Sequence, residues 1–503
     1  MNPQTIFSRC GTASKAVAAL VPPLAKPAPV KIGMLGVGLK MHFVWAEAER
    51  RFREGSQEIR ALAATESVEL LCPDTSFENP DALLAAADKL LAEGITGLIL
   101  FHGSYTAGEI GSELGRWLLD HPMPLLSWAY PEPKGGRLTA NSLCCQNFVL
   151  NTLHRLGVNY SWMFRDPADP GLAGDIKRFA RCVRARSRLR HGRVAIVGTG
   201  RVPGFYDAEC DELSVMRRFG LRFDRMGLEA AFDKAKRFSD ADVASVRTAL
   251  TNPKHCQLNN VPNRQADLTI RLALGTLVLA AEGGYTGCAL KCWPELFDLY
   301  GCAADGALTL LNDQGFPAAD ESDMNGLLTM MVMHHLTGGV GPPTLMDISL
   351  LDSVRNVLGF WHCGGSATRL VREGTLYEAR RHSILENANE ETACGLLVEA
   401  LLELGPVTAA RYQSPDSGQS FHFEGNVVDS PMAFRGSYAE VRPAGPHTAE
   451  QLMGSILSNG MDHHWVMGRG HFADDLAEFN HWLGVKNISV THPGSLHGLK
   501  SLR

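Results

Sequence analysis

The sequence predicts an α/β protein with two doubly wound parallel-sheet domains, followed by a β-rich barrel or sandwich domain. Short apolar runs typical of buried strands recur along the first two thirds of the chain, and amphipathic helical stretches separate them. Strands that alternate with helices form parallel sheets covered by helices. After Pro342-Pro343 the apolar runs are short and are divided by Gly and Pro clusters. This last pattern is typical of a mostly antiparallel domain.

The first α/β domain is expected over residues 29–170, after a flexible tail over residues 1–28. The tail carries no acidic residue, which resembles a transit peptide, but it has no apolar core and is interrupted by Pro22-Pro23, so we favour a flexible tail. A Pro- and Asp-rich segment at 165–171 is expected to end the domain. We expect strands at 31–36, 68–72, 97–101 and 124–130, and helices at 43–64 and 80–92.

The second α/β domain is expected over residues 171–345 and the β-rich domain over residues 346–503. In the second domain we expect strands at 193–197, 221–228 and 287–292, and helices at 240–251 and 263–281. In the third we expect strands at 356–361, 376–382, 407–412 and 420–428, and a helix near 448–457.

Charge and apolar patterning exclude several classes of partner. The 503-residue chain has a formal net charge of −6, which gives no broad cationic field for nucleic acid or a membrane surface. A basic run at 177–193 predicts an amphipathic helix with a solvated or subunit-contacting basic face, rather than a polyanion site. The longest apolar run, at 272–281, is far shorter than the ~18 residues of a membrane span. We therefore expect a cytoplasmic protein.

Two motifs suggest cofactors and are better explained otherwise. Cys288, Cys292 and Cys302 lack the paired spacing of a zinc knuckle, and adjacent Cys144-Cys145 is typical of reduced thiols. The glycine run at 198–204 has the spacing G-x-G-x-x-x-G and contains a proline, so it departs from the dinucleotide fingerprint. We expect buried thiols and no nicotinamide cofactor.

The segment at 319–326, Ala-Asp-Glu-Ser-Asp-Met-Asn-Gly, is the most informative stretch of the chain. Its carboxylates Asp320, Glu321 and Asp323 directly precede the apolar run at 327–333, which predicts a buried helix. Ser322 is the expected N-cap, and acidic residues suit the positive end of a helix dipole. These carboxylates have two interpretations. Either they are acidic decoration on a capped helix, or at least one of them points into a pocket.

Residues downstream favour the pocket. Asp347 supplies another carboxylate, and His463-His464 begins an expected buried strand with Asp462 as the orienting partner of a ligand histidine. Carboxylates and histidine with room for water favour Mn²⁺ or Mg²⁺ over structural zinc.

With these residues in place, the sequence resembles the L-fucose/L-arabinose isomerase family, from about residue 31 to 495. The most specific match is ESDMNG at 321–326. The other matching segments are RLTANSLC at 137–144, GFYD at 204–207, ALKCWPE at 289–295, HLTGG at 335–339, WHCG at 361–364 and DHH at 462–464.

The resemblance implies a site and an assembly. Glu321, Asp347 and His464 would hold Mn²⁺ or another divalent cation such as Mg²⁺ or Co²⁺, and Glu321 and Asp347 would also be the catalytic pair. The substrate-binding residues would be Asn325, Trp361, His362 and His463, with His362 as a possible further metal ligand. Family members are commonly hexamers with active sites shared between subunits, so we expect a homohexamer.

The implied reaction is aldose–ketose isomerisation through a cis-enediol. A divalent cation acidifies the C2 proton, and carboxylates in different environments serve as base and acid. A pentose, a 6-deoxyhexose or a related modified sugar is the expected substrate. The alternatives are a sugar epimerase or a sulfosugar isomerase on the same scaffold, and a non-catalytic sugar-binding protein.

Overall fold

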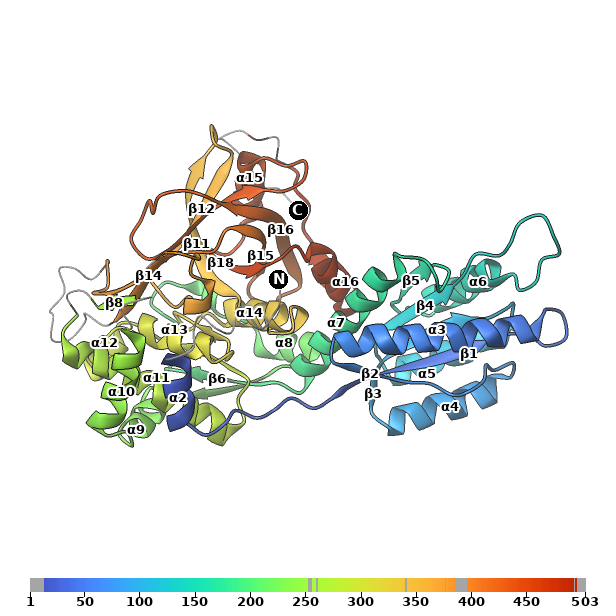
Figure 1. Cartoon of the computed structure of the whole chain (residues 1–503), viewed down its shortest axis with the longest axis horizontal. Helices are drawn as coiled ribbons and strands as arrows, with labels where there is room; N and C mark the ends of the chain where they lie inside the picture. The colour runs from blue at the N-terminus through green and yellow to red at the C-terminus, as the bar shows by residue number, and fades with distance from the viewer. Residues whose placement is uncertain are drawn as a thin grey trace. The chain divides into compact units, whose positions relative to one another are not determined.

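The computed structural model describes residues 13–251, 256–258, 261–339, 342–375, 377–384, 396–492 and 494 (Figure 1). The chain forms two compact units. The smaller unit contains residues 27–188 and 477–483, and the larger unit takes the described parts of residues 1–26, 189–476 and 484–503. No helix among the described residues is long and apolar enough to cross a membrane.

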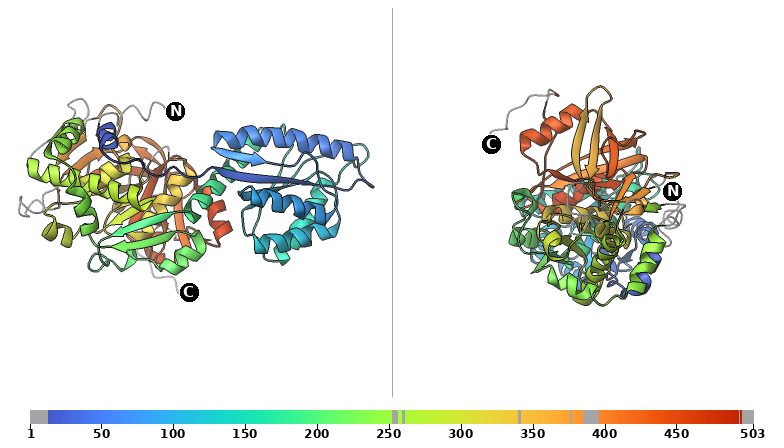
Figure 2. Two further views of the ribbon diagram at one scale, coloured as in Figure 1. Left: turned by 90° about the horizontal axis from the view of Figure 1, so that it is seen from below. Right: turned by 90° about the vertical axis from the view of Figure 1, so that its left-hand side faces the viewer.

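The smaller unit is a parallel five-stranded sheet with helices on both faces (Figure 2). Its strand order is β2-β1-β3-β4-β5, a doubly wound arrangement. Apolar side chains of α3 and α7 pack on one face, and those of α4, α5 and α6 pack on the other. The strands are β1 (Val30–Val37), β2 (Val68–Leu71), β3 (Ile95–His102), β4 (Leu125–Ala129) and β5 (Ser161–Phe164). The helices are α3 (Trp45–Thr65), α4 (Pro80–Ala92), α5 (Gly108–Asp120), α6 (Ser142–Arg155) and α7 (Leu172–Arg190).

The larger unit begins its own parallel sheet at β6, with the order β10-β9-β6-β7. Its core is formed largely by the long apolar helix α11. The strands are β6 (Arg193–Val197), β7 (Arg222–Met226), β9 (Gly287–Leu290) and β10 (Ala318–Ala319). The helices are α8 (Glu212–Phe219), α9 (Glu229–Ala235), α10 (Asp240–Leu250), α11 (Asn263–Gly283), α12 (Glu295–Leu299), α13 (Asp305–Asp313) and α14 (Met324–Leu336).

A mixed ten-stranded sheet completes the larger unit, and six of its strands close into an antiparallel barrel. The closing contact pairs β16 with β17, so the order around the barrel is β16-β15-β18-β11-β12-β17. The barrel strands are β11 (Thr344–Asp352), β12 (Val357–His362), β15 (Gly405–Tyr412), β16 (Gln419–Val428), β17 (Ser437–Pro443) and β18 (His464–Arg469). The parallel α/β sheets and the β-rich part confirm the predicted fold class.

The remaining strands extend the barrel sheet with parallel pairings of β14 to β17, β13 to β8 and β19 to β16. The extension is therefore mixed rather than antiparallel throughout. These strands are β8 (Cys256–Leu258), β13 (Tyr377–Arg380), β14 (Leu397–Leu401) and β19 (Lys486–Asn487), and the last helices are α15 (Ala449–Asn459) and α16 (Ala473–Leu483).

Two local expectations differ from the structure. Within the expected flexible tail, α2 (Ala13–Leu20) is a helix whose Val17 is buried in the core of the larger unit; residues 1–12 lie outside the described residues. On α7, Arg184 is buried and not solvated, because it donates to the backbone and carboxylate of Glu66. The smaller unit includes most of α7, and the expected boundary at 170 stays a prediction. The division of the larger unit at residue 345 stays a prediction.

We predict that Gly275→Ala destabilises the protein although alanine favours helices. A Cβ at Gly275 on α11 would lie 2.6 Å from the Ala231 carbonyl oxygen and 2.6 Å from the Ala235 nitrogen on α9. Overpacking of this kind costs roughly 1–3 kcal/mol. Gly174→Ala on α7, where a Cβ meets open space, is the control and should be neutral or stabilising. Thermal unfolding measures both, and equal midpoints would contradict the close helix packing.

Candidate active site

The predicted acidic residues come together where the parallel sheet of the larger unit meets the barrel. Glu321 lies in the turn between β10 and α14, and this turn is tied to β9 because Ser322 N donates to the Leu290 carbonyl (3.1 Å). Asp347 and His464 face each other in the register of β11 and β18. The closed barrel therefore brings Asp347 and His464, far apart in sequence, onto adjacent strands.

The turn that carries Glu321 has an unfavourable backbone conformation. Glu321 and Ser322 have φ values of 56° and 55°, in the left-handed region. Each such residue costs roughly 1–2 kcal/mol. The Asp320 carboxylate supports the turn by accepting from the Glu321 nitrogen (2.8 Å). Ser322, the predicted N-cap, is not the cap: Asp323 caps α14 by accepting from Gly326 N (2.8 Å).

His464 is the centre of the site. Its Nε2 lies 2.8 Å from Glu321 Oε2 and 3.8 Å from Asp347 Oδ1. The second oxygen of Glu321 accepts from Trp293 Nε1 (3.1 Å). Asp347 Oδ1 is buried and has no hydrogen-bond partner among the described residues. A buried carboxylate oxygen without a donor is costly, so this oxygen fits a cation that would satisfy it.

Neighbouring charges shift the pKa values of the site. Burial alone would raise the pKa of Glu321, but the hydrogen bond and charge of His464 outweigh it and hold that pKa below its ordinary value. Burial alone would lower the pKa of His464, but Asp323 and Glu321 raise it to about 10. In the absence of a metal ion, the pair is therefore a carboxylate and an imidazolium.

The orienting partner of His464 differs from the prediction. Asp323, not Asp462, lies at its Nδ1, with Oδ2 at 2.9 Å. Asp462 instead accepts from Arg411 Nε (2.9 Å) and from Ser414. Local spacing suggested Asp462 because it is two residues away, whereas Asp323 is brought from another element by the fold.

Other predicted residues differ in how closely they approach this centre. The centre of the His362 ring is 5.7 Å from that of His464. One ring nitrogen of His362 lies within 4.8 Å of potential metal-ligand atoms of Glu321 and His464. The His463 ring lies 3.9 Å from the His464 ring, tilted by 44°, and its Nδ1 pairs with Asp207 (2.7 Å). Trp361 lies opposite Asp347 on β12 and donates to the Arg435 carbonyl (2.8 Å).

Asn325 is not brought to the site. It is fully buried, its Nδ2 donates to the Glu209 carbonyl (3.0 Å), and its Oδ1 accepts from Ser417 (2.5 Å). These contacts use its amide to join α14 to neighbouring loops. A structural role therefore accounts for Asn325 better than the predicted contact with substrate.

The glycine run at 198–204 also has a place at the site. Gly198, Gly200 and Gly204 have positive φ values, so the loop after β6 turns sharply before Phe205. The Phe205 ring lies edge-on to Trp293 (5.7 Å) and to His463 (4.9 Å). The glycine run therefore places the Phe205 ring against Trp293 and His463, next to Glu321.

Sequence reasoning missed a buried polar cluster next to the site. Asp305, at the start of α13, accepts from Cys363 Sγ (3.0 Å) and pairs with His382 Nε2 (3.2 Å). His362 lies beside Cys363 (3.6 Å between Nδ1 and Sγ). Burial and the charges of Asp305 and Glu321 hold the pKa of Asp320 well above its ordinary value. The WHCG segment was a signal for this cluster, but nothing in the sequence linked it to Asp305.

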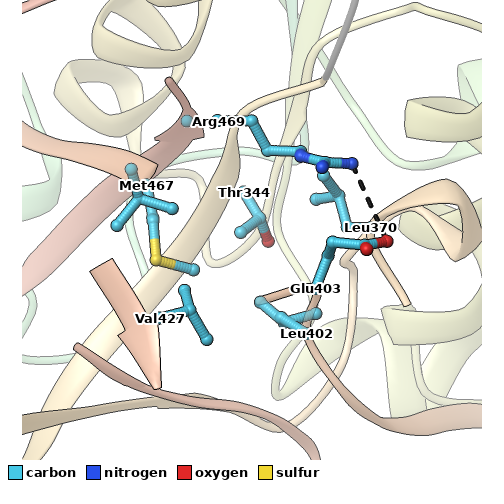
Figure 3. A pocket seen from close by; sticks show the side chains of 9 residues that line it. Thr344, Leu370, Leu402, Glu403, Val427, Met467 and Arg469 are labelled. Atoms are coloured by element: carbon cyan, nitrogen blue, oxygen red, sulfur yellow. Dashed lines mark ion pairs between the residues drawn. The ribbon is translucent and has the colours of Figure 1, made fainter. Parts of the chain in front are cut away.

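A separate apolar pocket lies at the barrel (Figure 3). Thr344, Val427 and Met467 line it, and an ion pair between Arg469 and Glu403 (3.8 Å) lies at its edge. None of its lining residues belongs to the Glu321–His464 centre. Its apolar walls do not suit a polyhydroxylated ligand, so the candidate site remains at His464.

Donor atoms at the site suit a divalent cation. Glu321, His362 and His464 form one group with donor atoms within 4.8 Å, and Asp347, His463 and His464 form another. Both groups share His464 and mix carboxylate oxygen with imidazole nitrogen. Such mixed sets bind Mn²⁺ and related ions.

The chain is similar to curated sulfoquinovose isomerases. It is 26% identical over 376 residues to that of Alkalicoccus urumqiensis, which covers 74% of this chain and 81% of that protein. It is 25% identical over 423 residues to that of Priestia megaterium (strain ATCC 12872 / QMB1551), covering 83% and 90%. For Clostridium sp. (strain MSTE9) the identity is 27% over 360 residues, covering 70% and 77%. No protein-family model matches the chain.

The chain also matches a solved structure with a low TM-score. A solute-binding protein of an ABC transporter from Agrobacterium vitis, bound with α-D-tagatopyranose, matches with a TM-score of 0.17 and 13% identity, over 61% of this chain and 89% of that chain. The curated relatives, which match most of the chain, support the prediction that it is an aldose–ketose sugar isomerase.

We predict that the stability of the metal-free protein falls as pH rises from 6.5 toward 10. The pKa of His464 is raised from 6.5 to about 10, so in this window the folded state keeps a proton that the unfolded chain has lost. This stabilisation is complete below pH 6.5 and is lost by about pH 10, at no more than about 1.4 kcal/mol per pH unit. Urea unfolding at several pH values measures it. His464→Gln should flatten the profile, and equal slopes in both proteins would contradict the assignment.

Proposed function

We propose that the protein is a metal-dependent aldose–ketose isomerase that acts on a sulfosugar, with sulfoquinovose as the first candidate. The single observation that carries the proposal is the convergence of Glu321 and Asp347 on Nε2 of His464, at 2.8 and 3.8 Å. Similarity to sulfoquinovose isomerases over most of the chain supports the substrate class. It favours the sulfosugar among the alternatives that the sequence left open.

Glu321, Asp347 and His464 would hold the divalent cation, and His362 is placed to add a ligand. The unpartnered buried Oδ1 of Asp347 supports this set, since a cation would satisfy an oxygen that no donor reaches. A bound divalent cation would polarise O1 and O2 of the sugar and so acidify the proton on C2. Mn²⁺ is the proposed ion, with Mg²⁺ and Co²⁺ as alternatives.

The carboxylates Glu321 and Asp347 supply the acid and base chemistry. Glu321 is held ionised and fixed by His464 and Trp293, whereas Asp347 keeps one oxygen free of hydrogen bonds. Carboxylates in such different environments can divide the removal of a proton from C2 and the delivery of a proton to C1. Phe205 and Trp293 form an apolar wall that would limit water at the reacting carbons.

The substrate proposal is tested with a panel of sulfoquinovose, glucose, L-fucose and L-arabinose, assayed for ketose with Mn²⁺ and after chelation. We expect the sulfosugar to give ketose and EDTA to abolish the activity reversibly. An epimerase would give a second aldose without ketose, and a binding protein would convert none of the sugars. Full activity after exhaustive chelation would overturn the metal proposal alone.

We predict that Glu321→Gln and Asp347→Asn each lower kcat by at least ~10². Both variants keep the side-chain size, so the fold should stay intact and circular dichroism should match that of the wild type. Asp313→Asn is the control, since Asp313 is a buried carboxylate that accepts from Thr368, outside the proposed donor set. Near wild-type turnover by Glu321→Gln would show that the catalytic assignment is wrong.

The assembly and the location stay predictions. A homohexamer with sites shared between subunits is proposed on the resemblance alone, and a cytoplasmic location is proposed on the charge and apolar patterning of the sequence.

A further inference from the structure

The two ring nitrogens of His464 are held by carboxylates from opposite sides. Nε2 faces Glu321, and Nδ1 lies 2.9 Å from Oδ2 of Asp323. His464 and Asp323 are 1% and 0% exposed, so the Nδ1 contact is shielded from bulk solvent. The position of the ring is therefore set by its protein neighbours.

Asp323 is itself held by a buried arginine. Arg411 Nη1 donates to Oδ2 (2.5 Å) and Nη2 donates to Oδ1 (3.0 Å), so the ion pair is bidentate. Nε of Arg411 donates to Asp462 Oδ2 (2.9 Å), and the arginine is 1% exposed. A guanidinium fixed by two carboxylates cannot rotate away, so Asp323 has one available orientation.

Two further contacts fix Asp323. Its Oδ1 accepts from the nitrogen of Gly326, which caps α14. A Cβ at Gly326 would lie 2.3 Å from Asp323 Oδ2, so the glycine leaves the space that the carboxylate occupies. The turn, the cap and the arginine all hold the same carboxylate toward His464.

We infer that Asp323, clamped by Arg411, is a positioning residue that accepts the Nδ1 proton of His464 and so presents Nε2 as the metal-binding nitrogen. The inference rests on the proposed metal site. A ligand histidine whose other nitrogen donates to a carboxylate keeps one tautomer and one ring orientation. Asp323 would touch neither the cation nor the sugar, and it acts only through His464.

The substitution Asp323→Asn separates the positioning of His464 from the capping of α14. Both oxygens of Asp323 accept from Arg411, so an amide loses one of these two hydrogen bonds in either orientation. An amide oxygen at the Oδ1 position keeps the contacts with Nη2 of Arg411 and with Gly326 N, whereas the reverse orientation opposes both of these donors. The NH₂ group would then face Nδ1 of His464 and favour the tautomer that is protonated at Nε2, the wrong one for a metal ligand. Asparagine caps helices as well as aspartate does, so α14 should keep its cap.

The experiment measures Mn²⁺ binding to the full chain by electron paramagnetic resonance. The signal of free Mn²⁺ gives the Kd. The nitrogen coupling of bound Mn²⁺ reports whether histidine is a ligand. We expect Asp323→Asn to weaken Mn²⁺ binding by about 10- to 100-fold. We also expect it to lose the same nitrogen coupling that His464→Gln loses. Asp462→Asn is the matched control, because Asp462 also pairs with Arg411 but does not contact His464; it should keep the coupling.

The outcomes separate the inference from the proposed function. Wild-type protein that binds no Mn²⁺ would overturn both. Wild-type binding with nitrogen coupling, matched in Kd and coupling by Asp323→Asn, would overturn the positioning role alone. Equal losses in Asp323→Asn and Asp462→Asn would also overturn it, since they indicate general loosening around Arg411. If Asp323→Asn does not fold, Asp323→Ser keeps a capping hydroxyl too short to reach His464 and is measured in the same way.

Discussion

The buried ion pair between Arg411 and Asp323 is the interaction on which the site depends. It joins β15 to the start of α14, and through Asp462 and the Asp207 carbonyl it reaches the segment before β18 and the loop after β6. A buried charge without its partner is strongly destabilising, so these elements are held in one arrangement. The parallel sheet and the barrel of the larger unit are thereby fixed around the nitrogens of His464.

Charge balance explains why this arrangement suits a cation. Carboxylates outnumber cationic side chains around His464, and Arg411 and His382 are already paired with Asp323 and Asp305. The carboxylates are those of Asp305, Asp320, Glu321, Asp323 and Asp347. Burying such an excess is expensive unless protons or a metal ion compensate. The Asp320 carboxyl, whose pKa is raised, can be compensated by a proton. The Asp347 oxygen that accepts no hydrogen bond can be compensated by a metal ion.

The strained turn at Glu321 connects stability to the proposed chemistry. Left-handed residues persist only where surrounding contacts determine them, and here Leu290, Asp320 and Asp323 hold the turn on both sides. The strain directs Glu321 toward His464 rather than along the helix. Phe205 and Trp293 then cover this face, so a polar centre lies against an apolar wall, as a site for a sugar ring requires.

The sequence alone determined the elements and the chemical inventory. The strands and helices that periodicity named lie within a few residues of their observed bounds, because hydrophobic spacing is a local property, but other elements, among them α5, α6, α13, β11 and β17, were not predicted. The residues of the proposed metal site, Glu321, Asp347 and His464, were named from motif and resemblance. Only the tertiary structure decided that Asp323 and not Asp462 lies at Nδ1 of His464, that Asp323 caps α14, that Glu209 and Ser417 contact the Asn325 amide, and that β16 closes the barrel on β17. The contacts of His464 with Asp323 and of Asn325 with Glu209 join residues 141 and 116 positions apart, and local spacing carries no information about such contacts. The cap is a local contact, and Asp323 rather than Ser322 forms it because Ser322 lies in the left-handed region whereas Asp323 is extended.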